Sequence, residues 1–261
     1  MSPLVNYEVR EGVAILELCN PPANAYSYEM FRELDDAILR ARMDDAVHVL
    51  LLSGAGEKFF CAGADIAMLE KAEPSYKYYF CLHANETLLR LEHTPKLVIA
   101  ALGGHCVGGG LEVAMAADLR VAAEGAGKFG LPEINLGVLP GTGGTQRLAR
   151  LVGTAKAIEL MTRGDTFGAD EARALGLVNE VLPAEDFNER ALDYARQFCP
   201  PGRASQAAGL IKRAVKTGAD LSLEAGLSLE RELQQRLFAS EDSREGLSAY
   251  TGKRKPSFSG R

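Results

Sequence analysis

Two almost wholly apolar runs of strand length, Val47–Ser53 and Leu97–Leu102, constrain the fold of this chain more than any other feature. A strand can be apolar along its whole length only where both of its faces are covered, as in a parallel sheet flanked by helices. Helical patterns follow both runs, so strand and helix alternate between residues 47 and 117. This alternation predicts an α/β architecture built on parallel strands.

The N-terminal part adds a hairpin and a long amphipathic helix to this prediction. Residues 4–10 and 13–19 have the composition of two short strands, and Glu11-Gly12 between them favours a tight turn. Residues 27–43 place apolar side chains on one face of a helix. Residues 54–65 are predicted to form a loop.

The C-terminal half is predicted to be mainly helical after one more short strand, Leu119–Ala122. Pro200-Pro201-Gly202 interrupts the helical pattern and is the best candidate boundary. We therefore expect an α/β core over residues 1–199 and a helical region over residues 200–261. No internal sequence repeat is visible in either part. The expected helices are residues 145–151, 155–162, 169–175, 184–198, 204–217 and 221–240.

The composition argues against several classes of protein. The net charge of −6 disfavours nucleic acid as a partner, because such proteins present a basic surface. The longest apolar runs are far shorter than the roughly 20 residues that cross a bilayer, so no membrane partner is expected. Residues 1–10 lack a basic segment followed by an apolar one, which argues against a signal peptide. We therefore expect a cytoplasmic protein.

The cysteines and histidines predict neither disulfides nor a metal site. The five cysteines are odd in number and scattered, without a Cys-x-x-Cys pair, which is typical of reduced thiols in a cytoplasmic protein. The four histidines show no metal-ligand spacing to one another or to a cysteine. These residues are Cys19, Cys61, Cys81, Cys106, Cys199, His48, His83, His93 and His105.

A glycine-rich segment, residues 103–112, ends in Glu112 near the predicted start of a helix. Glycine lets backbone N–H groups approach a ligand closely, and a helix start offers unpaired donors and a partial positive charge. A P-loop would need Gly-Lys-Ser/Thr where Leu111-Glu112 stands, and a dinucleotide fingerprint would need glycine where Val113 stands. The segment therefore fits a developing oxyanion, with Glu112 either an acid/base residue or a solvated helical carboxylate.

Two further loops carry residues that suit such a site. Residues 60–66 are mostly small, and they either allow tight packing or supply a backbone donor, with Asp65 capping the following helix. Glu133 lies among apolar residues in the segment 129–147. Burial there would raise its pKa and keep a neutral acid available near pH 7, whereas the alternative is a glutamate in a surface turn.

The order and spacing of these loops resemble the enoyl-CoA hydratase/isomerase (crotonase) family, and the resemblance covers nearly the whole chain. Each motif alone is weak, whereas the set in this order is very specific. The motifs are Ala62-Gly63-Ala64-Asp65-Ile66, Gly108-Gly109-Gly110-Leu111-Glu112, Pro132-Glu133-Ile134, Pro140-Gly141-Thr142-Gly143-Gly144-Thr145-Gln146-Arg147-Leu148, Gly176-Leu177-Val178-Asn179-Glu180-Val181 and Lys253-Arg254-Lys255-Pro256-Ser257-Phe258.

The resemblance implies a fold, a substrate class and an assembly. The implied fold is an α/β, crotonase-like spiral of repeated ββα units with a helical C-terminal trimerisation region. The implied substrate is an acyl-CoA thioester, in which coenzyme A is part of the substrate, and no metal or redox cofactor is expected. The implied assembly is a homotrimer or a hexamer built as a dimer of trimers.

Two glutamates indicate a hydratase within that family. By the resemblance, the backbone N–H groups of Ala64 and Gly109 form an oxyanion hole, and crotonase-type hydratases carry glutamate at the positions of Glu112 and Glu133. We therefore expect an enoyl-CoA hydratase, a lyase of fatty acid metabolism that reversibly adds water in syn fashion to a 2-enoyl-CoA and yields a 3-hydroxyacyl-CoA. Glu112 is assigned as the base that activates water and Glu133 as the proton donor to C2.

Coenzyme A is expected to contact residues from two parts of the chain. The positions that match the family are Lys58 and the backbone of Ala62 and Ile66, near the adenine and pantetheine groups. By the same resemblance, the C-terminal helix contributes Tyr250 and Lys253 to the nucleotide end.

Two positions depart from the family pattern. Many members carry a basic residue just after Ala-Asp-Ile that reaches the nucleotide phosphates, but Ala67 and Met68 stand here, which puts that contact in doubt. The common Asn-Ala-Leu near the first helix is Asn24-Ala25-Tyr26 here. A tyrosine at this position would narrow or polarise the acyl pocket.

Three alternatives stay open from the sequence. One is a branched-chain hydratase of the 3-methylglutaconyl-CoA type, and another is a double-bond isomerase, which typically needs only one of the two glutamates. The third is an RNA-binding protein, since a few members of the family bind RNA. Only the basic segment Lys253-Arg254-Lys255 supports this third alternative.

Overall fold

The computed structural model describes residues 2–261 and begins with the predicted hairpin. Strands β1 (Val5–Arg10) and β2 (Val13–Leu18) pair in antiparallel fashion. The two turn residues, Glu11 and Gly12, have φ angles of 49° and 83°, and positive φ at both central positions defines the type I′ turn that tight hairpins favour. β2 pairs in parallel with the next strand, so the hairpin forms one edge of a larger sheet.

A six-stranded sheet forms the centre of the molecule, with the strand order β1-β2-β3-β5-β7-β9. β2 through β9 run parallel, which confirms the predicted α/β architecture. β3 is buried along its whole length and β5 nearly so, as their apolar sequences predict. The short edge strand β9 lacks a recognisable strand pattern because it begins with an exposed glutamate. The inner and edge strands are β3 (Val49–Gly54), β5 (Leu97–Leu102), β7 (Leu119–Ala123) and β9 (Glu180–Leu182).

A second, three-stranded parallel sheet explains how the chain repeats itself in space. Its strands β4 (Phe59–Cys61), β6 (His105–Val107) and β8 (Phe129–Gly130) each follow a strand of the large sheet. A helix or helical turn comes next each time, so within residues 2–261 a unit of one strand from each sheet and a helical segment occurs three times. The resemblance implies repeated ββα units of this kind. The predicted loop over residues 54–65 is wrong where β4 lies. Strands of two or three residues are too short to carry a periodic pattern, which hides the repeat in the sequence.

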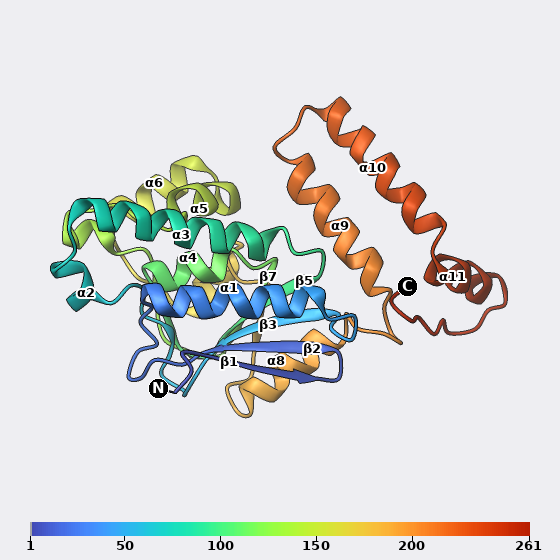
Figure 1. Ribbon diagram of the computed structural model, residues 1–261, viewed down its shortest axis with the longest axis horizontal. Helices are drawn as coiled ribbons and strands as arrows, with labels where there is room; N and C mark the ends of the chain where they lie inside the picture. Colours follow the sequence, from blue (N-terminus) through green and yellow to red (C-terminus); the bar gives the residue numbers. More distant parts are fainter. Residues whose placement is uncertain (1) are drawn as a thin grey trace.

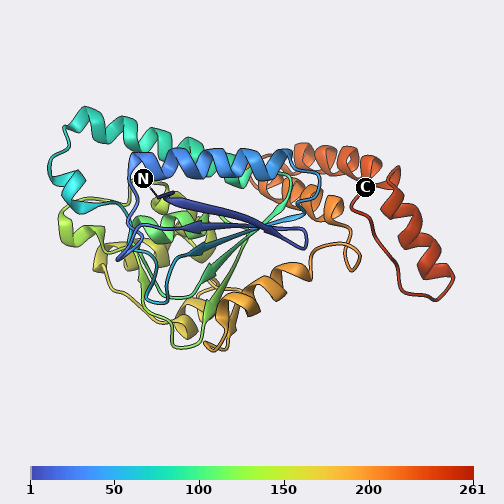
Figure 2. The ribbon, with the colours of Figure 1, turned by 60° about the horizontal axis from the view of Figure 1, so that its bottom comes forward.

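Helices cover both faces of the large sheet (Figures 1 and 2). Helices α1 (Tyr28–Met43) and α3 (Pro74–Glu92) lie along one face, and α8 (Phe187–Arg196) lies on the other. Ser27 caps α1 by accepting a hydrogen bond from the N–H of Met30, at 3.4 Å. The predicted helix over residues 27–43 is therefore confirmed, including its start.

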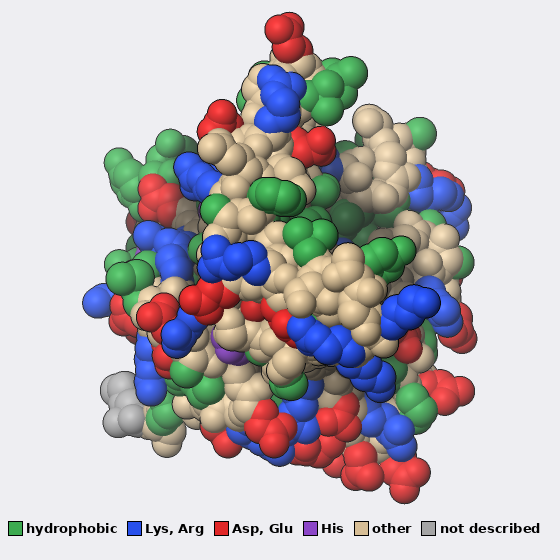
Figure 3. Space-filling view, turned by 90° about the vertical axis from the view of Figure 1, so that its right-hand side faces the viewer, with side chains coloured by type: hydrophobic (Ala, Val, Ile, Leu, Met, Phe, Trp, Pro, Cys, Tyr) green, Lys and Arg blue, Asp and Glu red, His purple; other side chains and the backbone are tan. Residues whose placement is uncertain are grey.

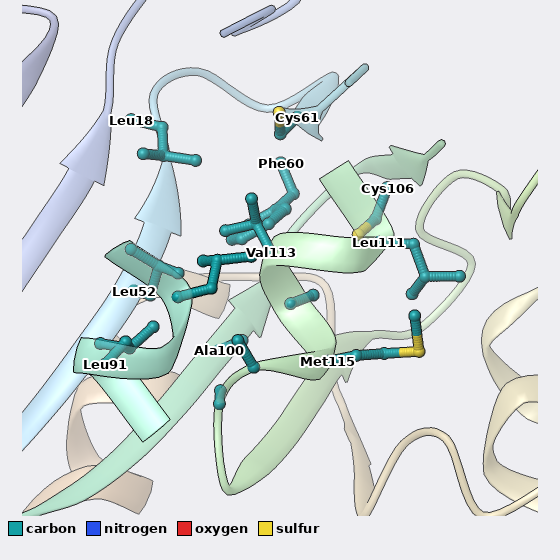
Figure 4. Packing of buried hydrophobic residues seen from close by; sticks show 14 of the residues in the cluster. Leu18, Leu52, Phe60, Cys61, Leu91, Ala100, Cys106, Leu111, Val113 and Met115 are labelled. Atoms are coloured by element: carbon teal, nitrogen blue, oxygen red, sulfur yellow. The ribbon is translucent and has the colours of Figure 1, made fainter. Parts of the chain in front are cut away.

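Alternation along β5 divides the interior into two cores. Val98 and Ala100 face the core that contains α1 and α3, whereas Ile99 and Ala101 face the core beneath α8. Figure 4 shows the first of these cores, where Val113 of the following helix lies among side chains of both sheets. The sheet is therefore packed against apolar side chains on both of its faces.

The remaining helices of the core are short. One of them, α4, is buried over its whole length. It carries Glu112, and a fully buried glutamate is unusual. A 3₁₀ turn, η1 (Glu133–Leu136), follows β8. The helices are α2 (Ile66–Glu70), α4 (Gly109–Met115), α5 (Gly144–Val152), α6 (Thr154–Arg163) and α7 (Ala169–Ala174).

The C-terminal helices form an arm that projects from the core (Figures 1 and 2). In this arm α9 (Ser205–Gly218) packs against α10 (Leu223–Phe238). A further helix, α11 (Glu241–Thr251), follows and is not among the helices expected from the sequence pattern. α9 holds the arm to the core, since Lys212 Nζ lies 2.8 Å from Asp118 Oδ2 and both side chains are under one-tenth exposed. A buried ion pair of this kind is strongly destabilising to break.

Large apolar side chains are exposed on the arm. Figure 3, which looks onto this end of the molecule, shows hydrophobic side chains between charged ones. Phe238 is 65% exposed and Tyr250 is 85% exposed. The division at residue 200 stays a prediction. None of the helices within residues 2–261 has the length and apolarity that crossing a membrane requires.

Candidate active site

Hydrogen bonds hold the residues on either side of Ala64, while the N–H group of Ala64 stays free. Tyr26 pairs with the residues on either side, because its N–H donates to Gly63 O at 2.9 Å and its carbonyl accepts from Asp65 N at 3.0 Å. The Asp65 carboxylate caps α2, as predicted. Within residues 2–261 the N–H of Ala64 donates to no acceptor.

Gly109 offers a second free N–H group next to the first. It is the first residue of α4, so its N–H has no partner inside the helix, and it has none elsewhere in the described chain. A Cβ atom added to Gly63 would lie 3.0 Å from the nitrogen of Gly109, which places the two loops against each other. Two unpaired backbone donors on neighbouring loops form the arrangement of an oxyanion hole.

The glycines before Glu112 also have a packing role. A side chain on Gly109 would overlap the hydroxyl and ring of Tyr26, and one on Gly110 would overlap the carbonyl of Cys61 in β4. Gly108 has a φ of +55°, which L side chains rarely adopt. The helix can therefore begin this close to β4 and Tyr26 only because these positions lack side chains.

Glu112 is an interior carboxylate held by the start of another helix. It is 2% exposed, and its Oε1 accepts hydrogen bonds from the N–H groups of Thr142, at 2.7 Å, and Gly144, at 2.6 Å. Burial raises its pKa, while these two donors act in the opposite direction. The alternative of a solvated helical carboxylate is therefore excluded. Neither of these two backbone hydrogen bonds uses Oε2, so this oxygen is available for proton transfer.

Glu133 lies on the other side of the glycine turn. A Cβ atom added to Gly108 would be 3.1 Å from Glu133 Oε1, while Oε2 is buried without a hydrogen-bond partner among the described residues. Burial, and to a smaller extent the charge of Glu112, raise the pKa of Glu133 to about 7. Glu133 begins a 3₁₀ turn whose next residues are exposed, but its own carboxyl is half-buried, so it can hold or release a proton near neutral pH.

Replacing Glu133 with glutamine is expected to stabilise the protein more at pH 8 than at pH 5. The pKa of about 7 in the folded protein lies above the usual 4.5, so the unfolded chain ionises first and this charge favours unfolding as the pH rises from about 4.5 to 7. Above that range the ionised carboxylate lowers the free energy of unfolding by its full amount, and below that range it has no effect. Each kcal/mol gained should raise Tm by roughly 2–4 °C.

Thermal unfolding of Glu133→Gln and the parent protein, followed by circular dichroism at both pH values, measures this effect. The difference in Tm between the two proteins should be larger at pH 8. The same difference at both pH values would contradict the raised pKa.

Thr142 is the functional residue that the sequence analysis missed. It is 2% exposed, and each of its polar atoms is used: the N–H binds Glu112, Oγ1 lies 3.1 Å from the Tyr26 hydroxyl, and the carbonyl accepts from Arg147 Nη1 at 3.1 Å. Burial, followed by the charge of Glu112, raises the pKa of Tyr26 well above its usual value, so its hydroxyl stays protonated. The Pro-Gly-Thr-Gly-Gly motif is the sequence signal for this turn, but it does not reveal that the turn binds Glu112.

The residues expected to contact coenzyme A fall into two separate groups. Lys58, Ala62 and Ile66 flank β4 and the Ala64 loop; Lys58 is exposed and Ile66 is 58% exposed. Tyr250 and Lys253 belong to α11 and the residues after it, at the opposite end of the molecule from α2 (Figures 1 and 2). Within one chain the structure does not bring these two residues to the rest of the predicted site.

The basic tail gives little support to the RNA-binding alternative. Arg254 makes a bidentate pair with Glu245, with Nη1–Oε1 and Nη2–Oε2 distances of 2.5 and 2.7 Å, and this pairing lowers the pKa of Glu245 to about 2. Two lysines are then left as unpaired charges in residues 253–255. The five cysteines are free, and residues 2–261 contain no cluster of three or more side chains suited to a metal.

Comparison with known proteins agrees with this geometry. The family model of enoyl-CoA hydratase/isomerase matches residues 8–261. The crotonyl-CoA hydratase of Syntrophomonas wolfei is 38% identical, over 96% of this chain and 96% of its own, and the short-chain-enoyl-CoA hydratase of Clostridium acetobutylicum is 38% identical over 94% of each. A crystal structure of the enoyl-CoA hydratase of Geobacillus kaustophilus is 43% identical with a TM-score of 0.96, covering 100% of this chain and 98% of that one. The chain belongs to the enoyl-CoA hydratase/isomerase family.

Proposed function

We propose that this protein is an enoyl-CoA hydratase in which Glu112 and Glu133 exchange protons with the substrate beside the free N–H groups of Ala64 and Gly109. The observation that carries this proposal is the pair of glutamates on either side of the glycine turn, both with raised pKa values. An isomerase needs one group to move a proton between two carbons. Addition of water needs one group at the water and another at C2, which two carboxyls provide.

The reaction follows from the placement of these groups. The N–H groups of Ala64 and Gly109 bind the thioester oxygen, and Glu112 Oε2 accepts a proton from the water whose oxygen bonds to C3. The π electrons of the double bond move onto the thioester oxygen, where the two donors stabilise the enolate. Protonated Glu133 then delivers its proton to C2, and the enolate returns to the thioester. Water is added across the double bond without any change in oxidation state, so the chemistry requires no redox cofactor.

Hydration of crotonyl-CoA tests the proposal, since loss of the conjugated thioester absorbance reports the reaction directly. A panel of longer, branched and 3-methylglutaconyl thioesters, ranked by kcat/KM, identifies the acyl group. A 3-enoyl thioester tests for isomerisation. Folded protein that hydrates none of these substrates would refute the proposal.

Tyr26 is expected to tune this activity through its hydroxyl. Replacing Tyr26 with phenylalanine removes the hydrogen bond to Thr142 Oγ1. Losing about 1 kcal/mol from the turn that orients Glu112 should lower kcat/KM for crotonyl-CoA roughly fivefold. Replacement with leucine removes the ring that packs against Gly109 and should shift preference toward bulkier acyl groups. Tyr28→Phe, at a partly exposed position two residues away, is the control. It should change neither kcat/KM for crotonyl-CoA nor the preference among acyl groups. Equal activities in all these proteins would contradict this role.

We further propose that the arm joins three chains, or six, and that Tyr250 and Lys253 bind the coenzyme A of a neighbouring chain. Two facts support this: the arm exposes large apolar side chains, and these two residues lie too far from α2 to act within one chain. Light scattering coupled to gel filtration should give three or six times the mass of the chain. A fully active monomer would contradict the assembly. The five free cysteines fit a reducing compartment, so we place the enzyme in the cytoplasm.

A further inference from the structure

Arg147 of α5 lies behind the turn that binds Glu112. Its Nη1 donates to the carbonyl of Thr142 at 3.1 Å, and a side chain on Gly143 would collide with the same nitrogen. The Arg147 side chain is 12% exposed, so a cation is packed directly against the segment whose N–H groups hold the carboxylate. The guanidinium therefore contacts the backbone of the same turn that binds Glu112.

A chain of ion pairs extends from Arg147 to the C-terminal arm. Arg147 Nη2 lies 2.5 Å from Glu92 Oε2 at the end of α3, and Lys216 of α9 lies 3.7 Å from Glu92 Oε1. Lys216 is also 3.0 Å from Asp118, which in turn holds Lys212 at 2.8 Å. The side chains of Glu92 and Asp118 are 18% and 8% exposed, so solvent screens these pairs only weakly.

Few ionisable groups face Glu112. Glu133 approaches from η1, Tyr26 from the segment before α1, and Arg147 from α5; among these, only Arg147 carries positive charge. Its cation favours the ionised form of Glu112, which is the form that a base requires.

We propose that Arg147 is a positioning residue for Glu112, and that Glu92 and Lys216 hold Arg147 in place. The docking of α9 on the core then sets the position of the turn that binds this carboxylate. This role of Arg147 rests on the proposed function, in which Glu112 is the base that activates water. The link between α9 and Glu112 does not depend on which reaction the protein catalyses.

The experiment is a carbon-13 NMR titration of the intact protein labelled at the glutamate side-chain carboxyls, with the Glu112 signal assigned by its absence from Glu112→Gln. Replacing Arg147 with methionine should raise the measured pKa of Glu112, because the only cation facing it is removed. Lys216→Met should raise it by less, in the same direction. Arg147→Lys keeps the charge but loses the two-nitrogen contact. The pKa of Glu112 in this variant should therefore lie near that of the parent protein, while kcat should stay below the parent value.

Arg150 provides a matched control. It lies on the same helix and pairs with Asp220 at the end of α9, at 3.7 Å, but its side chain is 62% exposed and contacts neither Thr142 nor Glu112. Arg150→Met should leave the titration of Glu112 unchanged. In kinetics, Arg147→Met should lower kcat roughly tenfold with little change in KM, and the acidic limb of the pH profile should move to higher pH.

The titration separates this proposal from the proposed function because it needs no substrate. A shifted Glu112 pKa in a protein that hydrates no enoyl thioester would retain the positioning role and refute the hydratase. An unchanged pKa in folded Arg147→Met, or a shift of equal size in Arg150→Met, would overturn the positioning role. If Arg147→Met does not fold, an unchanged Glu112 titration in folded Lys216→Met would overturn it.

Discussion

Replacing Glu112 with glutamine is expected to lower kcat/KM for crotonyl-CoA hydration by about 10³-fold, within the range of 10²–10⁴ that acid/base groups contribute. The fold should survive this change. The glutamine carbonyl can take the place of Oε1 and keep both hydrogen bonds, from Thr142 and Gly144, while the amide replaces the oxygen that accepts the proton. What is lost is the ability to take a proton from water. A steady-state hydration assay with thermal unfolding in parallel measures both effects.

Glu86→Gln is the control for this prediction, because Glu86 is an exposed residue of α3 that makes no contact with the site. It should retain full activity. Hydration by Glu112→Gln within tenfold of the parent would show that another group activates water. Survival of 3-enoyl isomerisation together with loss of hydration would show that Glu133 alone can move a proton between C2 and C4.

Replacing Gly109 with alanine is expected to lower kcat/KM by about 10²- to 10³-fold, which is the usual effect of losing one oxyanion donor. The new methyl group would overlap the hydroxyl and ring of Tyr26, so either the tyrosine or the start of α4 must move. Moving the start of α4 takes the Gly109 N–H away from the thioester oxygen. The overlap should also cost about 1–3 kcal/mol of stability, as overpacking of an interior does.

Two further variants separate the catalytic effect of Gly109→Ala from simple destabilisation. Gly168→Ala adds the same methyl group where nothing lies within 4 Å, and it should change neither activity nor Tm. Gly109→Ala combined with Tyr26→Leu removes the colliding ring and should recover part of the activity. Full activity in Gly109→Ala alone would contradict the prediction, because it would show that Tyr26 moves and the start of α4 stays in place.

Apart from its edge strand β9, the large sheet follows from the sequence because its signals are local. β3 and β5 are apolar along their length, the hairpin turn is Glu11-Gly12, and Ser27 precedes a helix with one apolar face. Each of these patterns spans a few residues and has one physical interpretation. The small sheet does not follow, because its strands are two or three residues long and are defined by pairing with distant segments.

The site divides in the same way. Glu112 and Glu133 can be identified from the sequence because each lies in a glycine- or proline-marked loop among apolar residues. The hydrogen bond between Thr142 and Glu112 spans 30 positions, and the contact of Arg147 with Glu92 spans 55. Such pairings exist only after the chain has folded, so no local pattern predicts them.

The three-stranded sheet has a consequence for the energetics of the proposed reaction. Ala64 follows β4, Gly109 and Glu112 follow β6, and Glu133 follows β8, so each repeat contributes one part of the site. Backbone hydrogen bonds tie these repeats together, including one of 2.8 Å from Gly108 N to Gly130 O. The donors and acids are therefore aligned before any substrate arrives, and little reorganisation energy is needed as charge moves onto the thioester oxygen. The short strands that are hardest to see in the sequence would thus lower the activation barrier.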